Sequence, residues 1–173
     1  MTRATRASAP VVARQSPTPI HRRIPLPATL FTTGLLIQQL ALARRKTSVT
    51  AMIAAGIVVG ISANIGIESF REFSRCATSH NPLRPERAAV LVTTGPNRYS
   101  RNPMYLALAG TLTAGAIARR CPLALVPVGG FIAAVSAWQI RQEEATLTSL
   151  FPHRYARYCQ RVPRWFSWRR ALG

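Results

Sequence analysis

Acidic side chains are scarce in this sequence: five Asp and Glu residues stand against 23 Lys and Arg, for a formal net charge of +18. A basic excess of this size first suggests a nucleic-acid-binding protein. Charged residues of all kinds, however, make up only 16% of the chain, whereas hydrophobic residues make up 48%. The basic residues form short clusters between long uncharged runs, and few aromatic residues are present to stack on bases. This distribution argues against a nucleic-acid partner and favours a membrane protein.

Cysteine is also rare, and the three cysteines lie far apart with no CxxC pair. Their number and spacing exclude a disulfide-stabilised scaffold and a zinc ribbon, and no metal site is expected. No GxGxxG motif follows a strand pattern, and no segment has the pattern of a βαβ unit. A Rossmann-type domain is therefore not expected.

Four uncharged runs carry most of the hydrophobic residues: 24–43, 47–67, 102–118 and 121–140. About 20 apolar residues in a helix cross a hydrocarbon core of about 30 Å. The sequence thus predicts an all-α integral membrane bundle of about four transmembrane helices, the first two within residues 24–67. Glycines at helical spacing, such as Gly56 and Gly60, predict close helix packing. Pro127, inside the fourth run, predicts a kink.

The distribution of basic residues predicts the orientation of this bundle. Five Lys and Arg precede the first run, six lie in residues 68–101 and seven follow the fourth run, whereas the two short connections carry five together. We therefore expect the N-terminus, the middle connection and the C-terminus in the cytoplasm. Residues 1–23 resemble a transit peptide in composition, but a disordered basic tail near anionic lipid is preferred, and residues 166–173 form a second basic tail.

Two polar segments would then lie at the same membrane face. In the first, residues 93–105, Asn102 before Pro103 predicts a helix start with Asn as the cap. The free N–H groups of that helix start, near Arg98 and Arg101, favour a carboxylate or phosphate. A basic loop whose side chains reach the lipid headgroups is the simpler alternative.

The second polar segment, residues 141–165, begins with paired glutamates after the fourth run. Arg141 is expected to pair with one of these carboxylates, and a bound cation would neutralise the other. Leu147, Phe151, Tyr155 and Tyr158 would share one face of a C-terminal interfacial helix, which Pro152 should interrupt.

Together the two segments resemble the isoprenylcysteine carboxyl methyltransferase and phospholipid methyltransferase family of integral membrane enzymes. The resemblance covers about residues 68–165 and rests on both segments occurring in the family's order around a helical hairpin. The matching pieces are Leu91-Val92-Thr93-Thr94-Gly95-Pro96, Arg98-Tyr99-Ser100-Arg101-Asn102-Pro103-Met104-Tyr105, Glu143-Glu144 with Leu147, Tyr155 with Tyr158, and Arg161-Val162-Pro163-Arg164.

This resemblance implies a methyltransferase core at 68–165 that uses S-adenosylmethionine in a cytoplasm-facing pocket, with a lipidic or hydrophobic small-molecule acceptor and membrane lipid around it. Arg98 and Arg141 are the expected catalytic residues, which would place an anionic acceptor. His80 and His153 are candidate bases for a neutral acceptor, although a surface or packing role is preferred for each. The residues expected to bind the cofactor are Tyr99, Arg101, Asn102, Tyr105, Glu143 and Glu144.

Some positions depart from the family pattern, and two other functions remain open. Cys76-Ala77-Thr78 replaces a common Gly-Thr pair, and Ala107 and Pro152 each stand where the family has glycine. A membrane reductase similar to the steroid reductases would use NADPH, and a non-catalytic basic membrane protein would bind anionic lipid. The glutamate pair and the Val162-Pro163 ending favour the methyltransferase.

Overall fold

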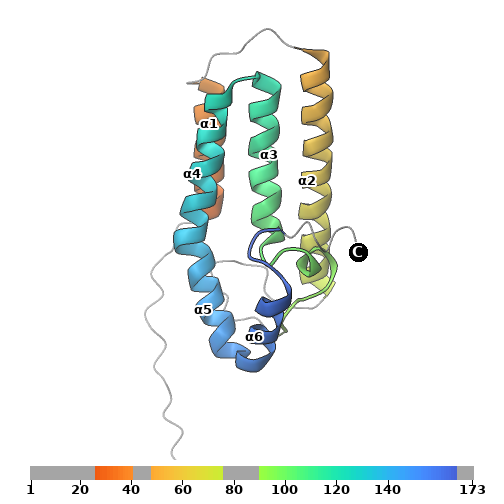
Figure 1. The fold of residues 1–173 in the computed structure, drawn as a ribbon, viewed down its shortest axis with the longest axis vertical. Helices are drawn as coiled ribbons and strands as arrows, with labels where there is room; N and C mark the ends of the chain where they lie inside the picture. Colours follow the sequence, from red (N-terminus) through yellow and green to blue (C-terminus); the bar gives the residue numbers. More distant parts are fainter. Residues whose placement is uncertain (1–25, 41–47, 76–89, 167–173) are drawn as a thin grey trace, which may run out of the picture.

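A computed structural model of the chain describes residues 26–40, 48–75 and 90–166 (Figure 1). These residues are helical throughout, with short connections and no strand among them, which confirms the all-α expectation. The predicted terminal tails, apart from Phe166, lie outside the described residues, as do Cys76, His80 and Glu86. The elements in chain order are α1 (Leu26–Leu40), α2 (Val49–Arg75), η2 (Gly95–Arg98), α3 (Pro103–Arg119), η3 (Pro122–Leu125), α4 (Val126–Ala134), η4 (Val135–Gln139), α5 (Ile140–Leu150) and α6 (Pro152–Arg161).

Four helices stand side by side, with α3 in contact with α1, α2 and α4 (Figure 1). Helix α5 continues α4 beyond the lower end of this bundle, and α6 folds back beneath it together with η2 (Figure 1). The main core lies between α3 and α4, where Leu112, Phe131 and Val135 are buried against α1. A smaller core holds α6 in place through Leu91, Tyr155, Tyr158 and Val162.

Two stretches of the described chain are long and apolar enough to cross a membrane: α2 and the continuous helical stretch Pro122–Leu150. The other two predicted spans are shorter, because α1 has 15 described residues and α3 has 17. At about 1.5 Å per residue the described part of α1 and helix α3 measure about 22 and 26 Å, less than the hydrocarbon thickness of about 30 Å. The sequence therefore predicted the positions of all four helices, and within the described residues two of them meet the length of a full span.

Both long stretches keep most of their apolar surface on the outside of the protein. Only 11% of the apolar part of α2 and 33% of that of Pro122–Leu150 are buried. Along α2, Ile53, Ile57 and Ile61 are all more than half exposed. A core helix of a water-soluble protein would bury such side chains, whereas a helix in lipid exposes them.

Small residues bring α2 and α3 together, and only some of the glycines that suggested close packing in the sequence take part. A Cβ atom on Gly110 would clash with Ser62 Oγ, so this position tolerates no side chain without movement. A Cβ on Gly66 would meet Ala107 at 3.6 Å. For Gly56 and Gly60, by contrast, an added Cβ would have no neighbour within 4 Å, so the prediction that they pack against a neighbouring helix is wrong for the described residues.

The prolines of the second half divide the chain into its helices. Pro152 interrupts the C-terminal helix as predicted: α5 ends at Leu150, Phe151 leaves the helical conformation and α6 starts at Pro152. Pro127, where the sequence predicted a kink, lies in the first turn of α4 directly after the 3-10 segment η3, a position where no N–H bond of α4 is lost. The irregularity lies instead at η4, a π-helical segment between α4 and α5.

Candidate functional site

The loop that leads into α3 is fixed to the end of α2. Gly95 adopts a left-handed conformation with φ of +57°, which glycine adopts without steric cost. The Thr94 hydroxyl donates a hydrogen bond to the Glu72 carboxylate, and a Cβ on Gly95 would touch the same glutamate side chain. The first predicted polar segment, residues 93–105, therefore starts from an anchored loop rather than from a free one.

Asn102 does not act as the helix cap that the sequence predicted. No side-chain capping bond is present at the start of α3. The Asn102 side chain instead donates through Nδ2 to the carbonyl oxygen of Arg164, at 2.8 Å, and the Arg101 backbone N–H donates to the carbonyl oxygen of Pro163, at 3.0 Å. The Val162–Pro163–Arg164 segment passes close enough to accept both bonds, and the Asn102 side chain is oriented toward it. Residues 101–102 and 163–164 are thus joined directly, although they lie about 60 positions apart.

Glu144 connects the same two segments through charge. Its Oε1 lies 2.9 Å from Arg101 Nη1 and 3.1 Å from Arg164 Nε, and its Oε2 accepts a second bond from Arg164. The side chains of Glu144 and Arg101 are 18% and 16% exposed, and that of Arg164 is 38% exposed. We call these three residues the charge interlock. Its Arg164–carboxylate contact is bidentate, which fixes the geometry as well as the charge.

Glu143 forms a second connection to α3. Its Oε1 accepts a hydrogen bond of 2.5 Å from the Tyr105 hydroxyl and one of 2.8 Å from Gln139 Nε2. Gln139 is the last residue of the π-helical segment, and π-helical turns are frequent at functional sites. Five of the six predicted cofactor-binding residues, all except Tyr99, therefore lie in these two networks, which meet at the adjacent Glu143 and Glu144 and which we together call the bonded group.

Two predicted residues lie outside this group. Arg141 is exposed on α5 and, within the described ranges, forms no ion pair, so the prediction that it pairs with a neighbouring glutamate is wrong. Arg101 and Arg164, which come from other segments, pair with Glu144 instead. Tyr99 is 43% exposed. The cation expected beside the glutamates has no obvious place, because no group of three or more metal-ligating side chains occurs in the part of the chain that the structure describes.

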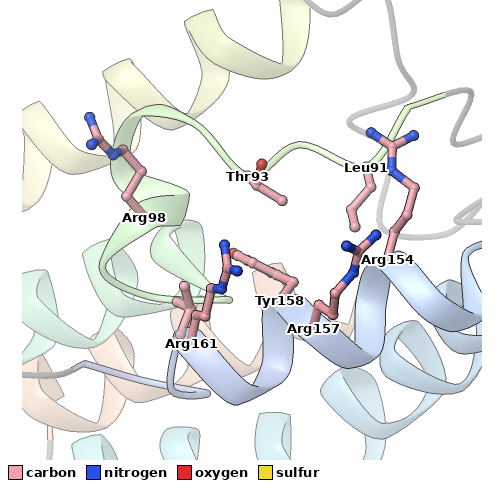
Figure 2. Close-up of a pocket in the computed structure, with 8 residues that line it drawn as sticks. Leu91, Thr93, Arg98, Arg154, Arg157, Tyr158 and Arg161 are labelled. Carbon is pink, nitrogen blue, oxygen red and sulfur yellow. The ribbon is translucent and has the colours of Figure 1, made fainter.

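A pocket of about 370 Å³ lies between the 91–98 loop and α6 (Figure 2). Arg98 and Arg154 stand toward its two ends, and Arg157 and Arg161 lie between them along α6 (Figure 2). We call it the basic pocket. Its lining consists of Leu91, Thr93, Arg98, Arg154, Arg157, Tyr158, Arg161 and Val162.

Helix α6 separates the basic pocket from the charge interlock. At 3.6 residues per turn, residues 154, 157, 158 and 161 share one face of the helix. Tyr155 and Cys159 lie on the adjacent face, where Arg101 Nη1 donates to Cys159 Sγ at 2.9 Å. Burial raises the pKa of Tyr155 and of Tyr158, and the hydrogen bond to Glu144 raises the pKa of Arg164. Both tyrosines therefore stay neutral and Arg164 stays charged at physiological pH.

Two buried nitrogen atoms near these sites have no hydrogen-bond partner among the described residues: Arg101 Nε and Asn97 Nδ2. Asn97 is 3% exposed, and its backbone oxygen accepts a bond of 2.6 Å from the hydroxyl of Tyr158, a residue of the basic pocket. Buried donors usually have partners, so each of these atoms marks a place where a ligand atom would be favoured.

Sequence reasoning missed several residues of these two sites. Arg164 and Gln139, which bind the glutamates, are not among the predicted site residues, since nothing in a linear sequence tells which arginine reaches which carboxylate. The clustering of the three arginines of α6, by contrast, could have been predicted from the sequence. Once Pro152 is taken as the helix start, residues 154, 157 and 161 fall at positions i, i+3 and i+7, which places them on one face.

Comparison of the chain with protein-family models, with curated proteins and with solved structures found no match.

Proposed function

We propose that this protein is a membrane-embedded methyltransferase that uses S-adenosylmethionine and resembles the isoprenylcysteine carboxyl methyltransferases. The observation that carries the proposal is the direct bonding of the two motif segments, Arg101 to Glu144 and Tyr105 to Glu143. If these residues matched the family's motifs only by chance, we would not expect the two segments to be in contact in the fold. The methyl acceptor would be lipidic or hydrophobic, because the neighbouring helices expose apolar surface.

The residues of the bonded group suit the polar atoms of S-adenosylmethionine. Its amino group and ribose hydroxyls need acceptors, and both hydrogen bonds to Glu143 reach Oε1, which leaves acceptor capacity at Oε2. Its carboxylate needs a donor, and the buried Nε of Arg101 has no partner among the described residues. When bound, the cofactor supplies a methyl group on a sulfonium, which transfers without an acyl intermediate.

The protein's own residues would hold and orient the cofactor and the acceptor and would not themselves react. Glu143 would bind the cofactor's polar groups, Tyr105 and Gln139 would keep that carboxylate in place, and the charge interlock would hold the C-terminal segment over the site. Positioning and exclusion of water are the main contributions that such a transfer requires. The placing of an acceptor by Arg98 and Arg141 stays a prediction, and only Arg98 lines the basic pocket.

Membrane insertion and a cytoplasmic site are parts of the same proposal. They are supported by the exposed apolar faces of α2 and Pro122–Leu150 and by the excess of basic residues in the segments flanking them. The segments that carry the bonded group, among them the start of α3 and helix α5, lie toward the lower end of the bundle (Figure 1). This end would face the cytoplasm.

Binding of radiolabelled S-adenosylmethionine to the purified protein in a mild detergent tests the proposal. We expect saturable binding that Asn102→Ala weakens and that Glu144→Gln abolishes, since these changes release the C-terminal segment. Glu68→Gln is the matched control: it removes the same charge from an exposed pair with Arg71, away from the site, and should leave binding unchanged. Thermal unfolding of each variant checks that it remains folded at the assay temperature.

Two results would contradict the proposal at different levels. If the unaltered protein does not bind S-adenosylmethionine but binds NADPH, the reductase-like alternative is correct. If S-adenosylmethionine binds equally well to Asn102→Ala and Glu144→Gln, the function stands but the site is elsewhere. After binding is established, a screen of prenylated peptides, phospholipids and isoprenoids with a labelled methyl group would identify the acceptor.

A further inference from the structure

The basic pocket concentrates positive charge without any acid to balance it. Four of its eight lining residues are arginines, and none of the eight is acidic. Each of the four described glutamates bonds elsewhere: Glu68 to Arg71, Glu72 to Thr94 and Arg75, Glu143 to Tyr105 and Gln139, and Glu144 to Arg101 and Arg164. Within the described ranges the pocket arginines therefore have no ion-pair partner.

The walls of this pocket are held in place by buried contacts. Tyr158 and Val162, on the α6 side, and Leu91, on the loop side, pack in the smaller core. The Tyr158 hydroxyl donates to the Asn97 carbonyl oxygen at 2.6 Å, which ties the short helix carrying Arg98 to α6. The pocket is thus a preformed hollow between two anchored elements, and its guanidinium groups project from fixed backbone positions.

Like charges gathered around one hollow repel each other, and an anion bound among them relieves that repulsion. A guanidinium group is planar and donates in pairs to two oxygen atoms at once, a geometry that fits both carboxylate and phosphate. Four such groups, together with the Thr93 hydroxyl, offer more donors than the two oxygens of a carboxylate can accept. Phosphate, with more oxygens and up to two negative charges, fits this set better.

We propose that the basic pocket binds a phosphate group, carried either by the headgroup of an anionic lipid or by a soluble phosphorylated molecule. A volume of about 370 Å³ exceeds that of a phosphate ion alone, so part of the bearing molecule has room inside. This inference does not depend on methyl transfer, because it rests on the charge and lining of the pocket.

Isothermal titration calorimetry of the purified full chain in a neutral detergent tests the inference with three probes. These are inorganic phosphate, short-chain phosphatidic acid and short-chain phosphatidylcholine, the last two matched in their acyl chains. We expect saturable binding of phosphatidic acid or inorganic phosphate and much weaker binding of the zwitterionic lipid. Binding of phosphatidic acid alone identifies a lipid headgroup as the source, and equal binding of inorganic phosphate identifies a soluble ligand.

Two single variants and one control connect that binding to the pocket. Arg157→Gln and Arg161→Gln should each weaken binding of the phosphate probes about tenfold. Each variant removes one guanidinium group that can donate charged hydrogen bonds to phosphate oxygens. Arg120→Gln removes the same charge from an exposed residue at the far end of α3 and should have no effect. Arg157 and Arg161 are themselves exposed, so both variants should fold, as thermal unfolding would verify.

The inference is overturned if neither phosphate probe binds saturably, or if phosphatidylcholine binds as tightly as phosphatidic acid. It is also overturned if Arg120→Gln weakens binding as much as the pocket variants, since the effect would then come from net charge. Failure here leaves the methyltransferase proposal intact, because S-adenosylmethionine binding is measured separately and depends on Glu144 and Asn102.

Discussion

The charge interlock and the basic pocket lie against neighbouring faces of the short helix α6. The arginines of the interlock are paired with an acid, whereas those of the pocket are not. In the interlock, Glu144 neutralises Arg101 and Arg164, and all three side chains are partly withdrawn from solvent. In the pocket, four arginines line a hollow with no acid in its lining. With only five acids in 173 residues, the position of each glutamate decides which arginines serve the fold and which remain available to a ligand.

The largest effect should come from breaking the interlock at its acid. Glu144→Gln leaves two half-buried guanidinium groups without a counter-charge, and we expect it to lower the free energy of unfolding by about 2–3 kcal/mol. Detergent-induced unfolding followed by tryptophan fluorescence measures this change. The control Glu68→Gln, which breaks an exposed pair on one helix, should cost at most about 0.5 kcal/mol. Equal losses in the two variants would mean that the interlock does not stabilise the fold.

The same substitution in the two regions sharpens the comparison. Arg164→Gln removes the bidentate contact to Glu144 and should lower the free energy of unfolding by about 1–2 kcal/mol. Arg157→Gln removes a charge from an unbalanced cluster and, in the absence of phosphate, should change stability by less than about 0.5 kcal/mol or raise it slightly. The same unfolding assay, in phosphate-free buffer, compares them. A destabilisation by Arg157→Gln as large as that by Arg164→Gln would show that the pocket arginines support the fold.

The smallest effect concerns Tyr158, whose hydroxyl connects the two walls of the basic pocket. Burial raises the pKa of Tyr158, so the folded protein keeps the phenol proton at a pH where the unfolded chain, with a pKa near 10, loses it. This contribution to stability is complete well below pH 10 and declines as the pH rises further, with a loss of about 0.4 kcal/mol at pH 10 itself.

Unfolding measurements between pH 8 and pH 11 test this expectation against Tyr158→Phe. The variant keeps the ring but has no proton to lose, so its stability should decline less steeply above pH 9. A slope remains, because burial also raises the pKa of Tyr155. Parallel pH profiles for the two proteins would contradict the assignment to Tyr158.

The helices could largely be predicted from the sequence, since their signals are local. The run 102–118 became α3 at Pro103–Arg119, and Pro152 separates α5 from α6 as a residue without a backbone N–H must. Helix α2 extends past its apolar run to Arg75, because the Glu68–Arg71 and Glu72–Arg75 pairs continue the helix on its polar side. Pro127 misled the prediction, since proline in a first turn and proline in a helix interior have the same sequence signature.

The pairing within the site could not be predicted. Asn102 has the type and position of a cap, whose side-chain oxygen would accept a bond, but the approach of the 163–164 turn gives its side chain a carbonyl group to donate to instead. Arg141 is the arginine nearest to the glutamates in sequence, but Arg101 and Arg164 reach Glu144 in space. Gly56 and Gly60 show the same limit: their spacing suits packing, yet they face away from the described helices.

The amino-acid order by itself determined that this chain is helical, rich in apolar surface and short of acids, because backbone preference, hydropathy and composition are properties of each residue and its near neighbours. Tertiary structure alone decided which arginine meets which glutamate and where four arginines share a pocket, because a charge contact depends on the distance between segments that the chain separates by tens of residues.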